Sequence, residues 1–258
     1  MNNLNLKKVA ENLIDTFIEA GNIAKKISSE GPKITIKADN TPVTNGDLAV
    51  DKLLRNKIID LTPGIPIISE ETVQLEKKNV SKNFWLIDPI DGTKEYIKNK
   101  DEYTINAALI IDLNPVMGLV YAPSKDRLFF SYGKNNAFEI NEAKKKPINC
   151  KKVNVNEIIG LANSDKTSDQ IISIYKKNKV TKITKMSSSL KFCTLAAGEA
   201  DIYAAMPRAF EWDIAAGHVI LEHAGGTVRS HEGNKLLYGK DSFRNPALIA
   251  KRAEKLDI

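Results

Sequence analysis

The sequence is poor in the residues that build disulfides and transition-metal sites. Its 258 residues include only three histidines and two cysteines. Cys150 and Cys193 lie far apart, with no paired spacing and no histidine beside either of them. A disulfide framework and a zinc site are therefore not expected, and both cysteines are predicted to be free thiols.

Long hydrophobic runs are also missing. No stretch approaches the run of about 20 apolar residues that a bilayer-spanning helix needs, and the start of the chain has helical periodicity rather than a signal-peptide core. We therefore expect a cytoplasmic protein with no stable membrane insertion. Hydrophobic residues make up 42% of the chain, enough to bury the core of one large domain or of two joined halves.

The formal net charge is +6, but the lysines are scattered in short groups such as Lys144–Lys146 and Lys176–Lys177, with few aromatic residues between them. This pattern indicates a solvated surface rather than a nucleic-acid-binding stripe. The charge balance still favours a small anionic substrate.

Apolar spacing predicts two amphipathic helices near the start of the chain. The first carries apolar residues from Leu6 to Ile18 and is expected to end near Gly21 or shortly beyond, and the second begins at Thr44 and stops before Thr62. Two short apolar strands are expected after them, at 65–68 and 84–87.

The pattern of elements then changes along the chain. Successive strands at 103–111, 116–121, 128–131 and 137–140 predict an antiparallel sheet. After residue 150, short strands near 160–162, 201–203 and 227–228 alternate with helices at 189–197 and 212–224. We expect a mixed α/β (α+β) fold with halves at 1–150 and 151–258 that form one integrated unit.

Five acidic residues fall where a strand ends or a helix begins, namely Asp47, Glu70, Asp88, Asp91 and Asp213. If they converge, their charges repel one another and require bound cations. An all-oxygen ligand set without histidine or cysteine favours a hard ion, and Mg²⁺ is the usual choice where phosphate supplies further ligands. Two such ions can clamp the attacking and leaving oxygens of a phosphoryl transfer.

Each acid also has a structural interpretation. Thr44 and Asp47 fit a capping box, which local evidence favours for Asp47. Glu70 fits a surface charge, and Asp213 fits an acid at a helix N-terminus. Asp88 and Asp91 are harder to explain structurally, because two acids bracket Pro89–Ile90 between a strand and a helix.

Gly92 and Thr93 open a predicted helix over 93–98, whose free N–H groups are suited to hold a phosphate. Thr93 fits either a helix cap or a hydroxyl that orients an attacking water.

Several motifs together resemble the inositol monophosphatase superfamily. They are TPVTNGD, IPIISEE, WLIDPIDGTKEYI, SSLKFCTLAAGEADIY and EWDIAAGHVILEHAGG, in family order over nearly the whole chain. The resemblance implies an αβαβα layered sandwich of the inositol monophosphatase and fructose-1,6-bisphosphatase type, with the active site between the two halves.

The resemblance also implies roles for individual residues. Two or three Mg²⁺ ions would be held by Glu70, Asp88, the carbonyl of Ile90, Asp91 and Asp213, with Asp88 bridging two ions. Asp47, Glu70 and Thr93 would activate the attacking water. Lithium inhibition is implied as well.

Lys94–Ile97 and Ser188–Cys193 resemble the superfamily's bacterial 3′(2′),5′-bisphosphate nucleotidases, which convert adenosine 3′,5′-bisphosphate to AMP and phosphate. The implied substrate contacts are Gly92, Thr93, Ser188, Lys191 and Asp213. Lys191 is the candidate cation for the phosphate that is retained.

These substrate contacts have alternatives. A helix cap is the structural interpretation of Ser188, and a solvated side chain that of Lys191. The family's Ser-Arg-Ser-His-like stretch is replaced by Asn163–Lys166. The alternative functions are an inositol-phosphate or sugar-phosphate phosphatase with the same metal chemistry, or a binding protein on the same fold.

Overall fold

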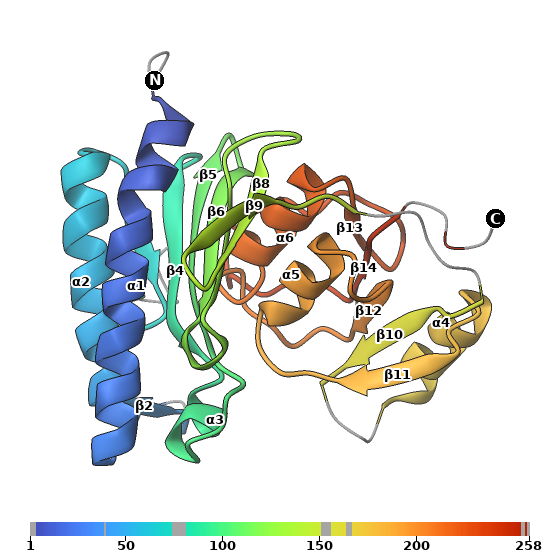
Figure 1. Ribbon diagram of the computed structural model, residues 1–258, viewed down its shortest axis with the longest axis horizontal. Coiled ribbons are helices and arrows are strands. Elements are labelled where there is room, and N and C mark those ends of the chain that lie inside the picture. Colours follow the sequence, from blue (N-terminus) through green and yellow to red (C-terminus); the bar gives the residue numbers. More distant parts are fainter. Residues whose placement is uncertain are drawn as a thin grey trace.

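Residues 4–38, 40–73, 81–150, 156–163, 167–253 and 256 are described by a computed structural model. They form five layers in the order helices, sheet, helices, sheet, helix (Figure 1). The expected αβαβα sandwich is confirmed. Among the helices described, none combines the length and the apolarity that a bilayer crossing requires.

The first layer consists of α1 (Leu6–Glu30) and α2 (Asn45–Leu61). The sequence predicted that this helix ends near Gly21 or shortly beyond, but α1 continues to Glu30, because its apolar face continues and buries Ala24 one turn after Gly21. A glycine weakens a helix without ending it when the packing face is continuous. A short antiparallel hairpin, β1 (Ile34–Ile36) and β2 (Pro42–Thr44), connects the two helices.

The second layer is a seven-stranded sheet in the order β3-β4-β5-β6-β7-β8-β9. β3 is parallel to β4, and every later pair is antiparallel, as predicted for the strands between 103 and 140. The strands are β3 (Ile67–Ser69), β4 (Phe84–Asp91), β5 (Thr104–Ile111), β6 (Asn114–Ala122), β7 (Arg127–Ser131), β8 (Ala137–Asn141) and β9 (Lys144–Pro147). Two short helices, α3 (Thr93–Ile97) and the 3-10 helix η1 (Pro123–Lys125), lie in its connections.

The remaining layers come from the second half of the chain. A five-stranded sheet has the order β11-β10-β12-β14-β13, with α5 and α6 on one side and α4 on the other (Figure 1). The strands are β10 (Ile159–Ala162), β11 (Lys182–Lys185), β12 (Ile202–Ala205), β13 (Thr227–Ser230) and β14 (Leu248–Lys251). The helices are α4 (Asp169–Lys177), α5 (Leu190–Ala196) and α6 (Ala215–His223).

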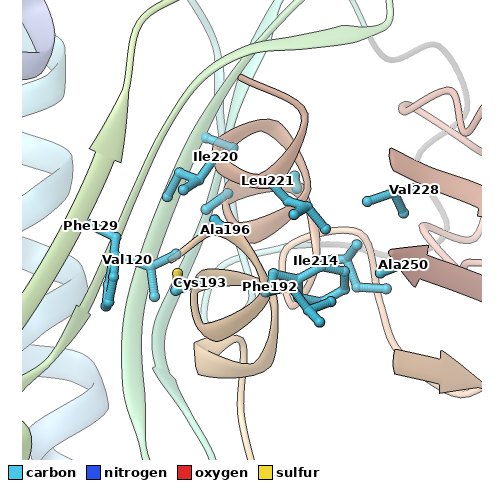
Figure 2. Close-up of a cluster of buried hydrophobic side chains, with 14 of the residues drawn as sticks. Val120, Phe129, Phe192, Cys193, Ala196, Ile214, Ile220, Leu221, Val228 and Ala250 are labelled. Carbon is cyan, nitrogen blue, oxygen red and sulfur yellow. The ribbon is translucent and has the colours of Figure 1, made fainter. Parts of the chain in front are cut away.

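The largest core cluster lies between the two sheets (Figure 2). Val120 and Phe129 come from the first sheet, Phe192 and Ile220 from the middle helices, and Val228 from the second sheet. Both halves of the chain therefore contribute to one continuous core. The boundary between the two predicted halves, 1–150 and 151–258, stays a prediction.

An ion-pair network also joins the two halves. The Arg127 guanidinium on β7 lies 2.6 Å from Glu139 and 2.6 Å from Glu199, which follows α5. Glu139 is buried, so its desolvated charge depends on Arg127 and on Lys146, which lies 2.9 Å from its Oε2 atom.

Candidate active site

β4 carries the centre of the candidate site at its C-terminal end. Asp88 pairs with Asn106 and Asp91 with Thr104, so the register against β5 shifts between the two aspartates. In a regular strand, residues three apart face opposite sides of the sheet, and such an irregularity changes that alternation. Burial chiefly raises the pKa of Asp88, and the charges of Glu70 and Asp91 raise it further.

Three carboxylates from three separate elements converge here. Glu70 follows β3, Asp88 lies in β4, and Asp213 precedes α6, yet each places one oxygen within 4.8 Å of the others. Burial is also the main cause of the raised pKa of Asp213, to which the charges of Asp91 and Glu70 add.

The chemistry of this cluster fits a bound hard cation. Asp88 is 1% exposed, and its Oδ1 atom has no hydrogen-bond partner among the described residues. A desolvated carboxylate oxygen without a donor is costly, and a metal ion satisfies it. The Ile90 carbonyl belongs to the same stretch of β4, and all of these donors are oxygens, which suits Mg²⁺.

Asp91 is held from the opposite half of the chain. Its Oδ2 atom accepts hydrogen bonds from the N–H of Ser189 at 2.5 Å and from its hydroxyl at 3.0 Å. The same hydroxyl contacts the Asp213 carbonyl. Burial raises the pKa of the Asp91 carboxyl, and Lys191 and Ser189 oppose that rise. Ser189 lies in the Ser188–Cys193 stretch, but no role was predicted for it, because its role depends on a contact with a residue 98 positions away.

Asp47 both caps a helix and faces the site. Its Oδ2 atom accepts the Thr44 N–H at 2.8 Å and the Thr44 hydroxyl at 2.5 Å, which completes the predicted capping box of α2. Its Oδ1 atom lies 3.4 Å from the Thr93 hydroxyl, which is also 3.1 Å from the Ile90 carbonyl. Burial raises the pKa of Asp47, so its carboxylate is a stronger base than a solvated aspartate.

Gly92 makes the sharp turn between β4 and α3. Its φ of 97° is left-handed, and a Cβ there would lie 2.9 Å from the Glu102 carbonyl oxygen. Gly92 holds the N-cap position and makes no side-chain cap hydrogen bond, so the first N–H groups of α3 are not capped by that residue. Thr93, the first residue of α3, is thereby placed beside the acids.

Lys37 is a site neighbour that the sequence reasoning missed. Its ammonium group lies 2.8 Å from Glu71 Oε2 and 3.4 Å from Glu70 Oε1. Burial raises the pKa of Glu71 to about 7, and Lys37 opposes that rise. Lys37 follows the β1 strand, 33 residues before Glu70, and no local pattern marks it.

A cavity of about 300 Å³ adjoins Asp91 and Asp213. Its other polar lining residues include Asn163, Ser188, Ser189, Lys191, Tyr203 and Arg208. Asn163 donates to the Tyr203 hydroxyl at 3.1 Å. The rest of the segment predicted to replace the family's substrate-contact motif, 164–166, lies outside the described residues.

Lys191 is buried rather than solvated. Its ammonium group donates to the Ser188 carbonyl at 2.5 Å and lies 5.1 Å from the centre of the Tyr203 ring. Burial lowers its pKa to about 8, with Asp91 acting in the opposite direction. Ser188 has a left-handed φ of 59°, and Ser189 instead holds the cap position of α5.

The fold and this site together identify the class of protein. Residues 5–257 match the model of the inositol monophosphatase family, and the chain belongs to that family.

Among its relatives, the 3′(2′),5′-bisphosphate nucleotidase CysQ of Buchnera aphidicola subsp. Acyrthosiphon pisum is 34% identical, over 92% of this chain and 89% of that protein. The crystal structure of CysQ from Bacteroides thetaiotaomicron has a TM-score of 0.79 at 29% identity, covering 96% of this chain and 98% of that one. SaIMPase-II with 2′AMP bound has a TM-score of 0.72 at 25% identity, over 92% of this chain and 87% of that one.

Proposed function

We propose that this enzyme is a Mg²⁺-dependent phosphatase that hydrolyses the 3′-phosphate of adenosine 3′,5′-bisphosphate, giving AMP and phosphate. The observation that carries this proposal is the continuity of the acidic cluster with a cavity that also contains Lys191 and Arg208. A nucleoside with two phosphates needs metal-binding carboxylates at one end and positive charge further away. The relatives named CysQ support the same reaction.

The carboxylates of Glu70, Asp88, Asp91 and Asp213, with the Ile90 carbonyl, would hold two or three Mg²⁺ ions. When bound, the ions neutralise phosphate charge and lower the pKa of water. Asp88 is the candidate bridging ligand, because it is fully desolvated and its Oδ1 atom has no protein partner among the described residues.

Thr93 and Asp47 are the candidates for positioning the attacking water. The Thr93 hydroxyl lies within hydrogen-bond distance of the Asp47 carboxylate and the Ile90 carbonyl. It can therefore donate a hydrogen bond to Asp47 while its own oxygen accepts one from water. As the water oxygen bonds to phosphorus and the P–O3′ bond breaks, one water proton can move through Thr93 to Asp47, and the released O3′ takes a proton from solvent water to become the ribose hydroxyl of AMP. Glu70 is the third member proposed for this role.

The phosphate would lie against the N–H groups at Gly92 and Thr93, with Asp213 beside the ribose. Ser188 and Lys191 border the same cavity, which supports them as contacts to the sugar or its phosphate. The apolar part of the lining, which includes Phe192 and Ile214, offers a surface for the base.

The test is phosphate release from adenosine 3′,5′-bisphosphate, inositol 1-phosphate and fructose 1,6-bisphosphate, each with Mg²⁺ and after chelation. We expect kcat/KM for the nucleotide to exceed the other two by more than about tenfold, a difference of about 1.4 kcal/mol in transition-state binding. A preference for inositol 1-phosphate would overturn the nucleotide assignment and leave the metal chemistry intact. Activity that survives chelation would contradict the metal mechanism.

A further inference from the structure

Arg208 is a cation of the cavity that none of the sequence motifs marked. It follows β12, precedes Asp213 by five residues, and its side chain is exposed on the wall of the cavity. Its backbone carbonyl accepts a hydrogen bond from Arg244 at 2.8 Å. Among the described residues, its guanidinium has no hydrogen-bond or ion-pair partner.

The backbone that presents Arg208 is held in place by its neighbours. Arg244 lies 3.8 Å from the centre of the Phe210 ring, and that ring stacks on Trp212 at 4.6 Å. Asn245 donates its N–H to the Ala209 carbonyl at 3.0 Å and its amide to the Phe210 carbonyl at 2.8 Å. The guanidinium therefore projects from a fixed loop, which reduces the entropy lost when it binds a ligand.

The charge of Arg208 acts on two other residues that line the cavity, Lys191 and Tyr203. It lowers the pKa of Lys191, for which burial is the larger cause. It also opposes the rise that burial produces in the pKa of Tyr203. Asp91 acts on both residues with the opposite sign. The cavity thus has an acidic end at Asp91 and Asp213 and a basic wall at Arg208.

Lys191 and Arg208 differ in what they can offer a second phosphate. The Lys191 ammonium group is buried, already donates to the Ser188 carbonyl, and has part of its charge offset by Asp91. The Arg208 guanidinium keeps its planar set of five donors, which matches two phosphate oxygens at once.

We propose that Arg208 binds the phosphate that remains on the nucleoside and so sets the preference for bisphosphates over monophosphates. This inference rests on the proposed nucleotidase function. The sequence suggested Lys191 as the cation that binds the retained phosphate, and we now assign that contact to Arg208. Lys191 instead interacts with Asp91, whose charge opposes the lowering of the Lys191 pKa.

The variant Arg208→Ala tests the assignment with two substrates, adenosine 3′,5′-bisphosphate and adenosine 3′-monophosphate. We expect kcat/KM for the bisphosphate to fall about 10- to 100-fold, mainly through KM, the range of one charged hydrogen-bonded contact. For the monophosphate the change should stay below about threefold, because it lacks the contacted group. Arg208→Lys should give a kcat/KM for the bisphosphate between those of the unmodified enzyme and Arg208→Ala, since lysine keeps the positive charge but lacks the planar pair of N–H donors.

Lys182→Ala is the matched control, because it removes one exposed positive charge from β11, outside the cavity. It should leave kcat/KM for both substrates unchanged. Equal losses on the two substrates in Arg208→Ala, or no loss on either, would overturn the assignment. Thermal melting of each variant identifies a folding defect.

Inhibition by AMP separates this inference from the proposed function, because it requires no turnover of the bisphosphate. Arg208→Ala should weaken inhibition by AMP about 10-fold or more and leave inhibition by adenosine unchanged. If the unmodified enzyme does not prefer the bisphosphate, the nucleotidase proposal fails, and weaker AMP inhibition in the variant would still support Arg208 as the phosphate contact. Unchanged AMP inhibition would reject the role of Arg208 whatever the substrate preference.

Discussion

Ser189 binds Asp91 through both its backbone N–H and its hydroxyl, and both hydrogen bonds end on the same carboxylate oxygen, Oδ2. Because Ser189 precedes α5 and Asp91 ends β4, this pair connects the two halves of the chain at the acidic cluster. The arrangement fixes the orientation of Asp91 and directs its other oxygen, Oδ1, away from these two donors. Asp91 is therefore a sensitive position for testing the site.

Asp91→Asn should nearly abolish turnover, by about 1,000-fold or more, because the loss of one charge disrupts metal binding while the amide keeps the side-chain shape. The protein should remain folded by circular dichroism. Asp60→Asn, which changes an exposed acid on α2, serves as the matched control and should keep full activity. Substantial activity in folded Asp91→Asn would remove Asp91 from the metal site.

Metal identity should separate binding from turnover. Mg²⁺ should restore activity to the chelated protein, whereas Ca²⁺ should bind and support little turnover, because its larger and looser coordination misplaces the water. Both ions should raise the melting temperature by relieving carboxylate repulsion. An ion that activates without a thermal shift would contradict this explanation.

The stability of the metal-free protein should fall as pH rises towards neutrality. Burial raises the pKa of Glu71 from 4.5 to about 7, so the folded state holds a proton that the unfolded state has lost. The stability linked to this proton is present below about pH 4.5 and is lost as pH rises through about 7. Asp88 and Asp213, whose pKa values are also raised, act in the same direction.

His223 opposes this trend in part of the range. Burial lowers its pKa to about 4, so its contribution to stability grows up to about pH 6.5. Melting temperatures with chelator should therefore be compared from pH 6.5 upwards, where they should decline, and Glu71→Gln should reduce the decline. With Mg²⁺ present the decline should be smaller. A metal-free melting temperature that rises over this range would reject the role given to the carboxylates.

Thr93 offers a conservative test of water positioning. Thr93→Val keeps the shape but removes the hydroxyl that lies 3.4 Å from Asp47, and it should lower kcat by about 100-fold, within the range of general acid–base effects. Thr93→Ser retains the hydroxyl and should keep most of the activity. Mg²⁺ binding, followed by the thermal shift, should be similar in both variants. Equal activities of the Val and Ser variants would exclude the hydroxyl from the mechanism.

Gly118 tests the packing of the middle layer. A Cβ at this position of β6 would lie 2.6 Å from Val219 Cγ1 and 2.7 Å from the Ala216 carbonyl oxygen, so α6 approaches the sheet closely. Gly118→Ala should destabilise the protein by about 1–3 kcal/mol, the usual range for overpacking. An unchanged melting temperature would mean that α6 can shift at little cost.

The part of the candidate site whose proximity follows from the sequence alone is the part that is continuous in the chain. Asp88, Ile90, Asp91, Gly92 and Thr93 lie along one strand end and one turn, so their proximity follows from local structure. The convergence of Glu70 and Asp213 on Asp88 came from a family resemblance, because no local rule places separate elements together.

Residues whose role depends on tertiary contacts were missed. Lys37, Ser189 and Arg208 are ordinary polar residues in sequence, and each becomes significant only through a neighbour that is distant in the chain or through the cavity. The same limit applied to the fold. The strands β9 and β11 were not predicted from the sequence, because both are edge strands with mostly exposed side chains and so lack the alternation of buried and exposed residues. The end predicted for α1, near Gly21 or shortly beyond, was wrong because the packing of the helix continues to Glu30.

The position of α5 and α6 between two sheets has a consequence for the order in which the protein is made. The seven-stranded sheet is complete at Pro147, but the inner face that carries Val120 and Phe129 is covered by helices that end only at His223. At about 5–20 residues per second, a ribosome leaves this apolar face uncovered for several seconds in each newly made chain. The nascent first half is therefore the species most exposed to aggregation, and a chaperone that recognises apolar strands would find its binding surface there.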